Sequence, residues 1–241
     1  MPSRRVHLPP SQIGEDRAAL TEGARHYLRD VLRLAPGDAV ELFDGRGAAW
    51  EARVEPGYQG LALGARREAA PGGPAIHLLF ALAKGEKCDL VVQKATELGA
   101  VRLAPFAAER SVVRLDAGKG AERAERWRRI AGEAARQCGR SDVPEVAPPA
   151  SLAAALAAVP AGFRLVVLHG EGGAPLGALG LEGAPGLAAV VGPEGGLTPP
   201  ELAACEAAGA LRATLGPRTL RAETAAIAAV ALLQGLVGDL R

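Results

Sequence analysis

The stretch from Ala188 to Leu202, AAVVGPEGGLTPPEL, constrains the fold most, because it places an apolar run, a glycine loop and a helix start side by side. The apolar run is typical of a buried strand, and the glycines permit positive φ and close approach of a ligand to the backbone. Thr198 fits an N-cap, Pro199 the first helical position, and Glu201 completes a capping box. This order predicts a ligand site at the carboxyl end of a parallel sheet.

The composition of this loop argues against a phosphate ligand. It matches neither the G-x-G-x-x-G fingerprint of dinucleotide sites nor the G-K-[ST] ending of a P-loop. No Lys or Arg lies between Gly192 and Leu211, and Glu194 would repel a pyrophosphate. The loop therefore weakens the interpretation as a nucleotide-binding oxidoreductase. It favours a cationic ligand with a ribose and a base, a description that S-adenosylmethionine meets.

Two other segments have a similar glycine-containing turn after an apolar run. VVLHGEGG follows one predicted strand, and ATLGPRTLRAET leads from another into the last predicted helix. Because the ends of parallel strands lie side by side, the three loops are expected to converge on one pocket. The alternative, that they are only tight turns in a glycine-rich chain, stays open at this stage.

The chain is expected to form two domains. Within residues 1–70, GARHYLRDVLRL predicts a short amphipathic helix, DAVELFDGRGAAWEARVE a β-hairpin around DGRG, and GLALGARRE a further strand. This pattern indicates a small, strand-rich barrel, and EAAPGGPA is typical of a linker. Over residues 71–241 strands and helices alternate, which predicts an α/β domain with a parallel sheet of about five strands.

Composition limits the cellular context. No apolar run approaches the ~20 residues of a membrane span, and MPSRRVHLPPSQ lacks the apolar core of a signal peptide, so a cytoplasmic protein with no membrane partner is expected. Cys88, Cys138 and Cys205 are few and far apart. They are expected to be inert buried thiols, and they suggest neither a disulfide framework nor a metal site.

Positive charge is concentrated in the middle of the chain. The formal net charge is only +1, yet Lys and Arg cluster between Lys84 and Arg140 and are sparse after Gly170. Such a basic segment is compatible with a bound polyanion. It is equally compatible with a solvated helix face, because Glu122, Glu125 and Glu133 are interleaved.

Specific motifs point to a family. GPEGGLTPPEL followed by LGPRTLRAETAAIAA resembles the RsmE family of small-subunit ribosomal RNA uridine-N3 methyltransferases, which belong to the SPOUT superfamily. Further matches are HYLRDVLRL, KGEKCDLVVQKATELGA, ERSVVR and RWRRIAGEAARQCGRSDVPEV. The resemblance spans essentially the full length. It implies a PUA-like RNA-binding barrel, a SPOUT domain with a deep trefoil knot that binds S-adenosylmethionine, and a homodimer that acts on 16S rRNA and uses no metal. Such a knot is an exception to the rule that chains are not knotted.

The resemblance also implies the residues of the cofactor site. Much of the binding is expected from backbone amides and carbonyls that read the adenine edge. His169 has the alternative of being a strand-end residue with no catalytic part. The implied cofactor-binding residues are Leu168, His169, Gly170, Gly192, Pro193, Glu194, Gly195, Gly196, Leu211, Leu215, Gly216, Pro217, Leu220 and Arg221.

Methylation at uracil N3 requires loss of the imide proton, and the resulting anion spreads onto the two flanking carbonyl oxygens. A cationic side chain stabilises that anion, and a carboxylate can accept the proton. Arg221 and Glu223, in LRAET, have these residue types and are the candidate catalytic residues. Arg221 could instead pair with Glu223 or Glu194, and Glu223 could serve only as a favourable charge at a helix start.

A basic track is the expected RNA contact, and its residues are carried over from the family's similar positions. Each could equally be a surface ion-pair partner, and an aromatic content of 3% argues against extensive base stacking. His26, Arg29 and Arg33 are expected to share a helical stripe. The full set is Arg4, Arg5, His26, Arg29, Arg33, Lys84, Lys87, Lys94, Arg110, Arg114, Arg136 and Arg140.

Two other functions compete with this interpretation. One is a SPOUT methyltransferase that acts on another RNA position, such as a ribose 2′-hydroxyl of transfer RNA. The other is a non-catalytic RNA-binding or ribosome-assembly module that kept the fold. The intact GPEGG and LRAET loops argue against the second alternative.

Overall fold

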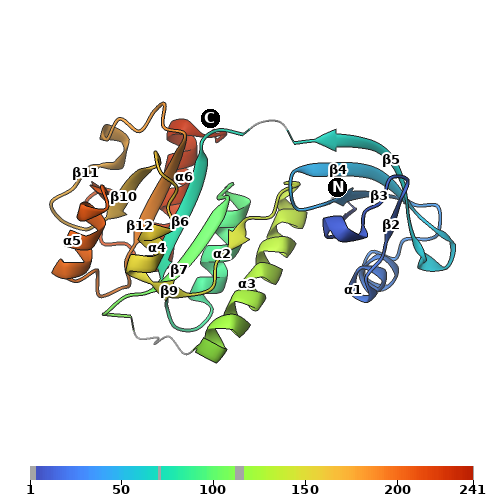
Figure 1. The fold of residues 1–241 in the computed structure, drawn as a ribbon, viewed down its shortest axis with the longest axis horizontal. Helices are drawn as coiled ribbons and strands as arrows, with labels where there is room; N and C mark the ends of the chain where they lie inside the picture. Colours follow the sequence, from blue (N-terminus) through green and yellow to red (C-terminus); the bar gives the residue numbers. More distant parts are fainter. Residues whose placement is uncertain (1–3, 70–71, 112–116, 241) are drawn as a thin grey trace. The chain divides into compact units, whose positions relative to one another are not determined.

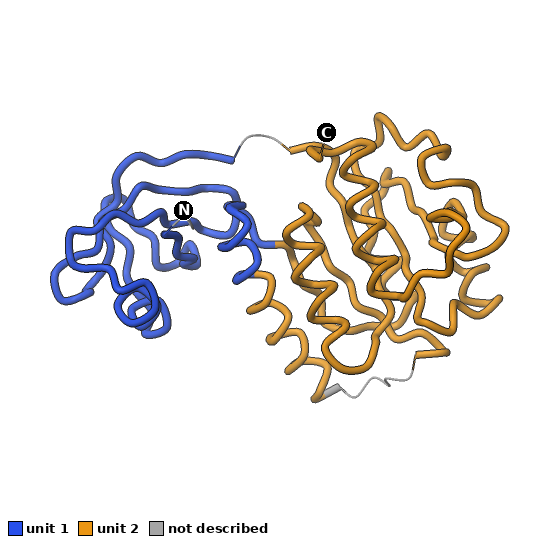
Figure 2. Tube along the Cα trace, turned by 180° about the vertical axis from the view of Figure 1, so that it is seen from behind, with its two compact units in different colours: residues 1–71, 132–143 blue, residues 72–131, 144–241 orange. Residues whose placement is uncertain are grey.

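The computed structural model describes residues 4–69, 72–111 and 117–240 of the 241-residue chain. It divides into two compact units (Figure 2). Unit 1 comprises residues 1–71 and 132–143, and unit 2 comprises residues 72–131 and 144–241. The sequence did not predict that residues 132–143 belong with the N-terminal segment.

Unit 1 is built on a five-stranded sheet with the order β1-β3-β4-β5-β2. The predicted hairpin is confirmed, because β3 and β4 pair antiparallel with Leu42 opposite Trp50. The alternating apolar side chains face a core that includes the fully buried Leu28 and Leu61. The strands are β1 Arg5–His7, β2 Arg17–Ala19, β3 Ala39–Phe43, β4 Ala48–Val54 and β5 Gly60–Glu68.

The helical parts of unit 1 are short. Thr21 caps the first α-helix, because its hydroxyl accepts a hydrogen bond from the Ala24 amide at 3.0 Å. A π-helical turn continues it and ends at Val31, and Arg33 beyond it has a φ of 53°. The expected helical stripe is therefore wrong for Arg33. The segments are η1 Pro10–Gln12, α1 Glu22–His26, η2 Tyr27–Val31 and η3 Pro56–Tyr58.

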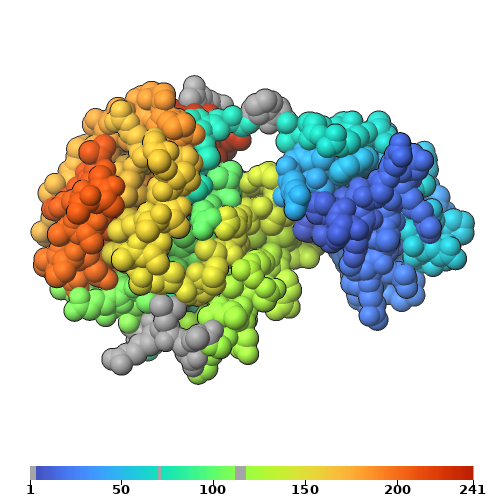
Figure 3. Space-filling view, viewed as in Figure 1, coloured from blue at the N-terminus to red at the C-terminus, as the bar shows by residue number. Residues whose placement is uncertain are grey.

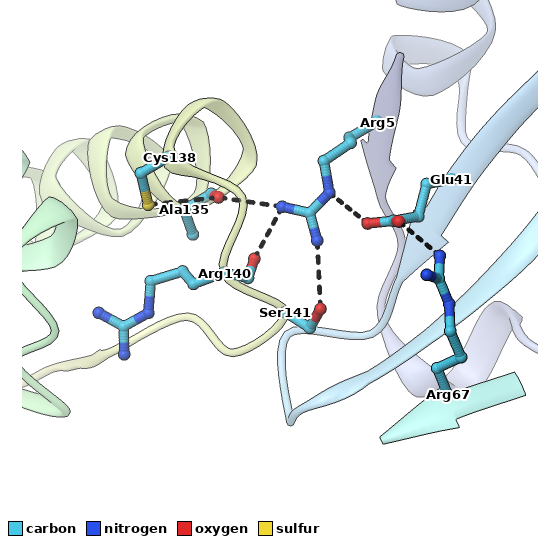
Figure 4. Close-up of polar contacts among 7 residues, drawn as sticks. All are labelled: Arg5, Glu41, Arg67, Ala135, Cys138, Arg140 and Ser141. Atoms are coloured by element: carbon cyan, nitrogen blue, oxygen red, sulfur yellow. Dashed lines mark hydrogen bonds and ion pairs between the residues drawn. The ribbon is translucent and has the colours of Figure 1, made fainter. Parts of the chain in front are cut away.

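Arg5 helps to hold residues 132–143 within unit 1 (Figure 4), beside backbone hydrogen bonds from that segment to the turn between β3 and β4. The Arg5 side chain is only 2% exposed, and its Nε donates to Glu41 Oε1 at 2.5 Å. Its Nη1 donates to the carbonyl of Arg140 at 3.0 Å and to that of Ala135 at 3.4 Å, while Nη2 donates to Ser141 Oγ at 3.1 Å. Arg5 therefore joins β1 and β3 to the end of a helix that is more than a hundred residues away in sequence.

Unit 2 contains the predicted parallel sheet, with the order β11-β13-β10-β12-β6-β7-β8 and β9 paired to β7 (Figure 1). Every strand pair in it is parallel among the described residues. The strands are β6 Ala75–Ala81, β7 Arg102–Ala107, β8 Glu145–Val146, β9 Ala150–Ser151, β10 Arg164–Leu168, β11 Ala174–Pro175, β12 Gly186–Val191 and β13 Leu211–Thr214.

Helices cover both faces of this sheet. Leu79 of β6 faces a core shared with α4 and α5, whereas the neighbouring Phe80 packs edge-on against Trp127 of α3, with ring centroids 6.4 Å apart. The helices α4 and α5 lie side by side on one face, as Figure 3 shows, and α6 packs on α2 and on β6 and β12 of the sheet. The helices are α2 Lys87–Glu97, α3 Ala117–Cys138, α4 Leu152–Ala157, η4 Leu176–Ala178, α5 Pro199–Ala207 and α6 Ala222–Val237.

One further expectation about the chain is corrected. Cys88 and Cys205 are buried free thiols as expected, but Cys138 is exposed at the last residue of α3. The expectation of a buried thiol is therefore wrong for Cys138. Separately, no helix within the described residues is long and apolar enough to span a membrane.

The Arg5 contacts lead to a stability prediction. Arg5→Met should lower the free energy of unfolding of unit 1 by about 3 kcal/mol, because it removes a buried cation that donates to Glu41 and to the carbonyls of Ala135 and Arg140. Arg4→Met is the matched control. Arg4 pairs with Asp38 at the surface, with 3.7 Å between the charged atoms, and its loss should cost below about 1 kcal/mol.

Urea unfolding combined with hydrogen exchange of the β1 and β3 amides measures the free energy of unfolding of unit 1 in both variants. Equal stability of the two variants would show that Arg5 does not hold residues 132–143 in unit 1.

Candidate functional site

The three glycine-containing loops meet at one cavity of about 220 Å³. Their convergence follows from the strand order, because β13, β10 and β12 are neighbours in a parallel sheet and their carboxyl ends lie at one edge. The start of α6 closes one side. Described lining residues include Leu168, His169 and Gly170 after β10, Gly192, Pro193, Glu194, Gly196 and Leu197 after β12, Leu215 to Leu220 after β13, and Ala222 and Ala225 of α6.

Three predicted cofactor residues do not line this cavity. Leu211 is exposed at the start of β13, at the opposite end of that strand from the loop. The carbonyl of Gly195 accepts a hydrogen bond from Arg110 Nη1 at 2.9 Å, outside the cavity. Arg221 is the exposed N-cap residue of α6 and follows the lining residue Leu220.

Glycine is required in the loop after β12 for two different reasons. Gly196 has a φ of +70°, and its amide donates to the carbonyl of Pro193 at 2.8 Å, which closes a tight turn. A Cβ on Gly192 would lie 3.0 Å from Leu197 Cγ and 3.2 Å from the Leu197 amide. The buried Leu197 therefore packs against the backbone at the exact point where the strand ends.

The N-terminus of α5 is already occupied by carboxylates of the chain. The capping box predicted for Thr198 and Glu201 is present, with the Thr198 amide donating to Glu201 Oε2 at 2.9 Å. Glu201 Oε1 accepts from the amide of Glu109 at 2.8 Å, and the Thr198 hydroxyl lies 3.1 Å from a carboxylate oxygen of Glu109. These contacts strengthen the argument against a phosphate site at this helix end.

The negative charge of Glu194 is balanced by a residue that sequence reasoning placed elsewhere. Lys87 Nζ lies 2.5 Å from Glu194 Oε1 and 3.5 Å from Glu223 Oε2. The hydrogen bond lowers the pKa of Glu194 and raises that of Lys87. The strand order could have indicated this contact, because Lys87 follows β6 and β6 pairs with β12, the strand that precedes Glu194.

Glu223 lies in a small separate space next to the cavity. Its side chain is 12% exposed, and that space is lined by Phe80, Lys87 and Cys88 among others. His169, in contrast, lines the cavity itself, and its Nδ1 lies 3.2 Å from the amide of Glu171, which donates to it. The described residues contain no group of three or more His, Cys, Asp and Glu side chains that could hold a metal ion.

The basic residues of unit 1 that were predicted to contact RNA differ in their exposure and in their ion pairs. Arg5 is buried and bonded within the fold, so the expectation that it contacts RNA is wrong. His26 and Arg29 are exposed and share the carboxylate of Asp30. Arg4 and Arg33 are also exposed. Arg136 stacks over the ring of Tyr27, with 3.9 Å to the centroid, and Arg140 pairs with Asp142.

The basic residues of unit 2 that were predicted to contact RNA mostly bind acidic side chains or backbone groups. Lys94 pairs with Glu97 at 2.8 Å, Arg110 holds the glycine loop, and Lys87 lies between two carboxylates. Lys84 is exposed. Arg114 lies outside the described residues.

Comparison with known families identifies the chain. Residues 71–234 match a family model described as an RNA methyltransferase domain, and residues 20–57 match one described as an RNA methyltransferase PUA domain. A relative from Mycobacterium tuberculosis, named ribosomal RNA small subunit methyltransferase E, is 37% identical over 217 residues, which cover 87% of this chain and 81% of the relative. The chain belongs to this methyltransferase family.

Other members and solved structures agree with this assignment. The ribosomal RNA small subunit methyltransferase E of Synechocystis is 34% identical over 97% of this chain and 78% of its own length. The structure of the Neisseria gonorrhoeae enzyme bound to S-adenosyl methionine is 30% identical, has a TM-score of 0.89, and covers 99% of this chain and 100% of its own. A putative methyltransferase from Legionella pneumophila in complex with the same cofactor is 31% identical, with a TM-score of 0.89 and 99% of each chain covered.

Proposed function

We propose that this protein transfers the methyl group of S-adenosylmethionine to N3 of a specific uridine in 16S rRNA of the small ribosomal subunit. The observation that carries the proposal is the cavity formed by three loops at the carboxyl ends of β10, β12 and β13, in a chain that belongs to a ribosomal RNA methyltransferase family. A cytoplasmic location, where ribosomes are assembled, belongs to the same proposal.

The cavity fits this cofactor chemically. Its walls consist largely of backbone and of apolar side chains such as Leu168, Leu197 and Leu215, which suit an adenosyl group. Of the described residues that line it, Arg218 is the one with a permanently cationic side chain. Glu194 is also a lining residue, and an acidic residue there disfavours a phosphate-rich ligand and tolerates a positively charged one.

When bound, the cofactor supplies an electrophilic methyl group on a sulfonium. The residues of this chain must then orient the uracil and stabilise the anion that forms when N3 loses its proton. We assign the stabilising role to Arg221, because its exposed side chain begins α6 directly after the lining residue Leu220. We assign proton acceptance to Glu223, which requires that the uracil reach past the cofactor cavity toward the space beside Lys87.

RNA contacts are proposed for the exposed or partly exposed basic residues of each unit. Phosphate contacts would position the RNA, while the target base enters the catalytic pocket. Unit 1 also carries the match to the PUA domain of RNA methyltransferases, which supports an RNA-binding role for it. The proposed set comprises Arg4, His26, Arg29, Arg33, Lys84, Lys94, Arg110, Arg136 and Arg140, together with Arg114, which lies outside the described residues.

A homodimer and a deep trefoil knot in unit 2 are part of this proposal. The dimer is supported by large apolar side chains on two packed helices, since Leu90 of α2 is 41% exposed and Leu232 of α6 is 47% exposed. The knot rests on the resemblance of the GPEGG and LRAET motifs to the SPOUT superfamily.

A methylation assay tests the reaction. The full chain is incubated with labelled S-adenosylmethionine and small ribosomal subunits that lack the modification, and the methylated nucleosides are mapped by mass spectrometry. We expect N3-methyluridine at a single site. Label in 2′-O-methyl nucleosides would contradict the proposal in favour of a different SPOUT activity, and cofactor binding without transfer would favour a non-catalytic module.

The role of Arg221 makes a separate prediction. Arg221→Ala should leave cofactor affinity nearly unchanged and slow methyl transfer by roughly a hundredfold, because it removes a cation that acts on the developing uracil anion. Single-turnover rates and calorimetric cofactor titration measure the two effects. The matched control is Arg212→Ala, because Arg212 pairs with Glu206 away from the cavity. Equal losses of binding and turnover in Arg221→Ala would refute this role.

The proposed dimer can be measured directly. Sedimentation velocity should give twice the chain mass of 24.6 kDa, and replacing Leu232 with Glu should shift the protein toward single chains by placing a charge in the apolar contact. A wild-type protein that sediments as a single chain at micromolar concentration would contradict the dimer.

A further inference from the structure

We propose that Lys87 is a positioning residue that shapes the cofactor cavity by tying the glycine loop after β12 to the first turn of α6. The inference rests on the proposed use of S-adenosylmethionine. It assigns to Lys87 a role different from the RNA contact expected from sequence, because the side chain is engaged by Glu194 and Glu223.

The backbone brings the three residues together from three elements. Lys87 is the first residue of α2, which follows β6. β6 pairs with β12 up to Phe80 opposite Val191, so the segment after β6 and the loop after β12 emerge at the same edge. Helix α6 packs on α2 and on both strands, which places Glu223 of its first turn beside the same ammonium group.

Lys87 is the charge partner of two carboxylates, of which Glu223 is 12% exposed and Glu194 is 43% exposed. Glu223 Oε2 is buried without a hydrogen-bond partner in the described structure, and Lys87 Nζ, at 3.5 Å, is its charge partner. Glu194 Oε1 contacts the same nitrogen at 2.5 Å. If the ammonium were removed, two carboxylates would face each other around an empty position, and their repulsion would push the glycine loop away from α6.

Such a movement would change the cavity at two walls. Glu194 and Gly196 line it from the loop, and Ala222 and Ala225 line it from α6, but Lys87 does not line it. Lys87 therefore acts on the cofactor only through the placement of these walls. The loop has a second tie from Arg110 to the Gly195 carbonyl, so loss of Lys87 should loosen the loop without unfolding it.

Calorimetric titration of the full chain with S-adenosylmethionine, without RNA, tests this role by a double-mutant cycle. Lys87→Met should weaken cofactor binding about tenfold, a change typical of coupled neighbours. Lys87→Arg should stay within about threefold of wild type. Combining Lys87→Met with Glu194→Gln should weaken binding less than the product of the two single effects, because Glu194→Gln removes the repulsion that Lys87 normally offsets. Lys119→Met, at an exposed position on α3, is the matched control and should bind as wild type.

Steady-state kinetics separates positioning from an RNA contact. Lys87→Met should raise the KM for S-adenosylmethionine about tenfold and leave the KM for RNA within about twofold. The inference would be overturned if Lys87→Met bound the cofactor with wild-type affinity. It would also be overturned if the effects of Lys87→Met and Glu194→Gln on the cofactor dissociation constant multiplied independently, or if only the KM for RNA rose. Lys87→Arg and Glu194→Gln, at partly exposed side chains, keep the test valid if Lys87→Met is poorly folded.

The two proposals fail in different ways. Coupling between Lys87 and Glu194 in cofactor binding supports the positioning role whatever nucleoside is methylated. A product other than N3-methyluridine would contradict only the proposed function. A wild-type chain that does not bind S-adenosylmethionine would overturn both.

Discussion

The parallel pairing of β13, β10, β12 and β6 is the constraint on which the site depends. In a parallel sheet all carboxyl ends lie at one edge, so loops from distant parts of the chain meet there. Each of these strands is followed by a segment that contributes to the cavity or to the charges beside it. The site is therefore a property of strand order, and no single motif would create it.

Electrostatics then selects the ligand. Carboxylates of Glu109 and Glu201 occupy the N-terminus of α5, and Glu194 adds a further negative group that Lys87 balances. A helix N-terminus that is already capped by carboxylates has few free N–H groups to donate to a phosphate. The same arrangement tolerates a cationic sulfonium ligand, so the physical reading of the loop agrees with membership in the methyltransferase family.

Local sequence patterns were sufficient to predict much of the fold. The hairpin around DGRG, the capped start of α5 and the alternating strands and helices of unit 2 follow from short-range chemistry and were predicted. The contacts of Arg5 and Lys87 were not predicted, because each joins segments about a hundred residues apart or more, and a surface-type residue carries no local sign of such a partner. The break at Arg33 was missed because its positive φ contradicts the helical periodicity around it.

A crystal structure of the full chain with S-adenosylhomocysteine tests the central claim most directly. The account predicts that the adenosyl group lies between the loops after β10, β12 and β13, with the Lys87–Glu194 contact intact. An adenosyl group bound elsewhere, or bound in this cavity with Lys87 turned away from Glu194, would contradict it.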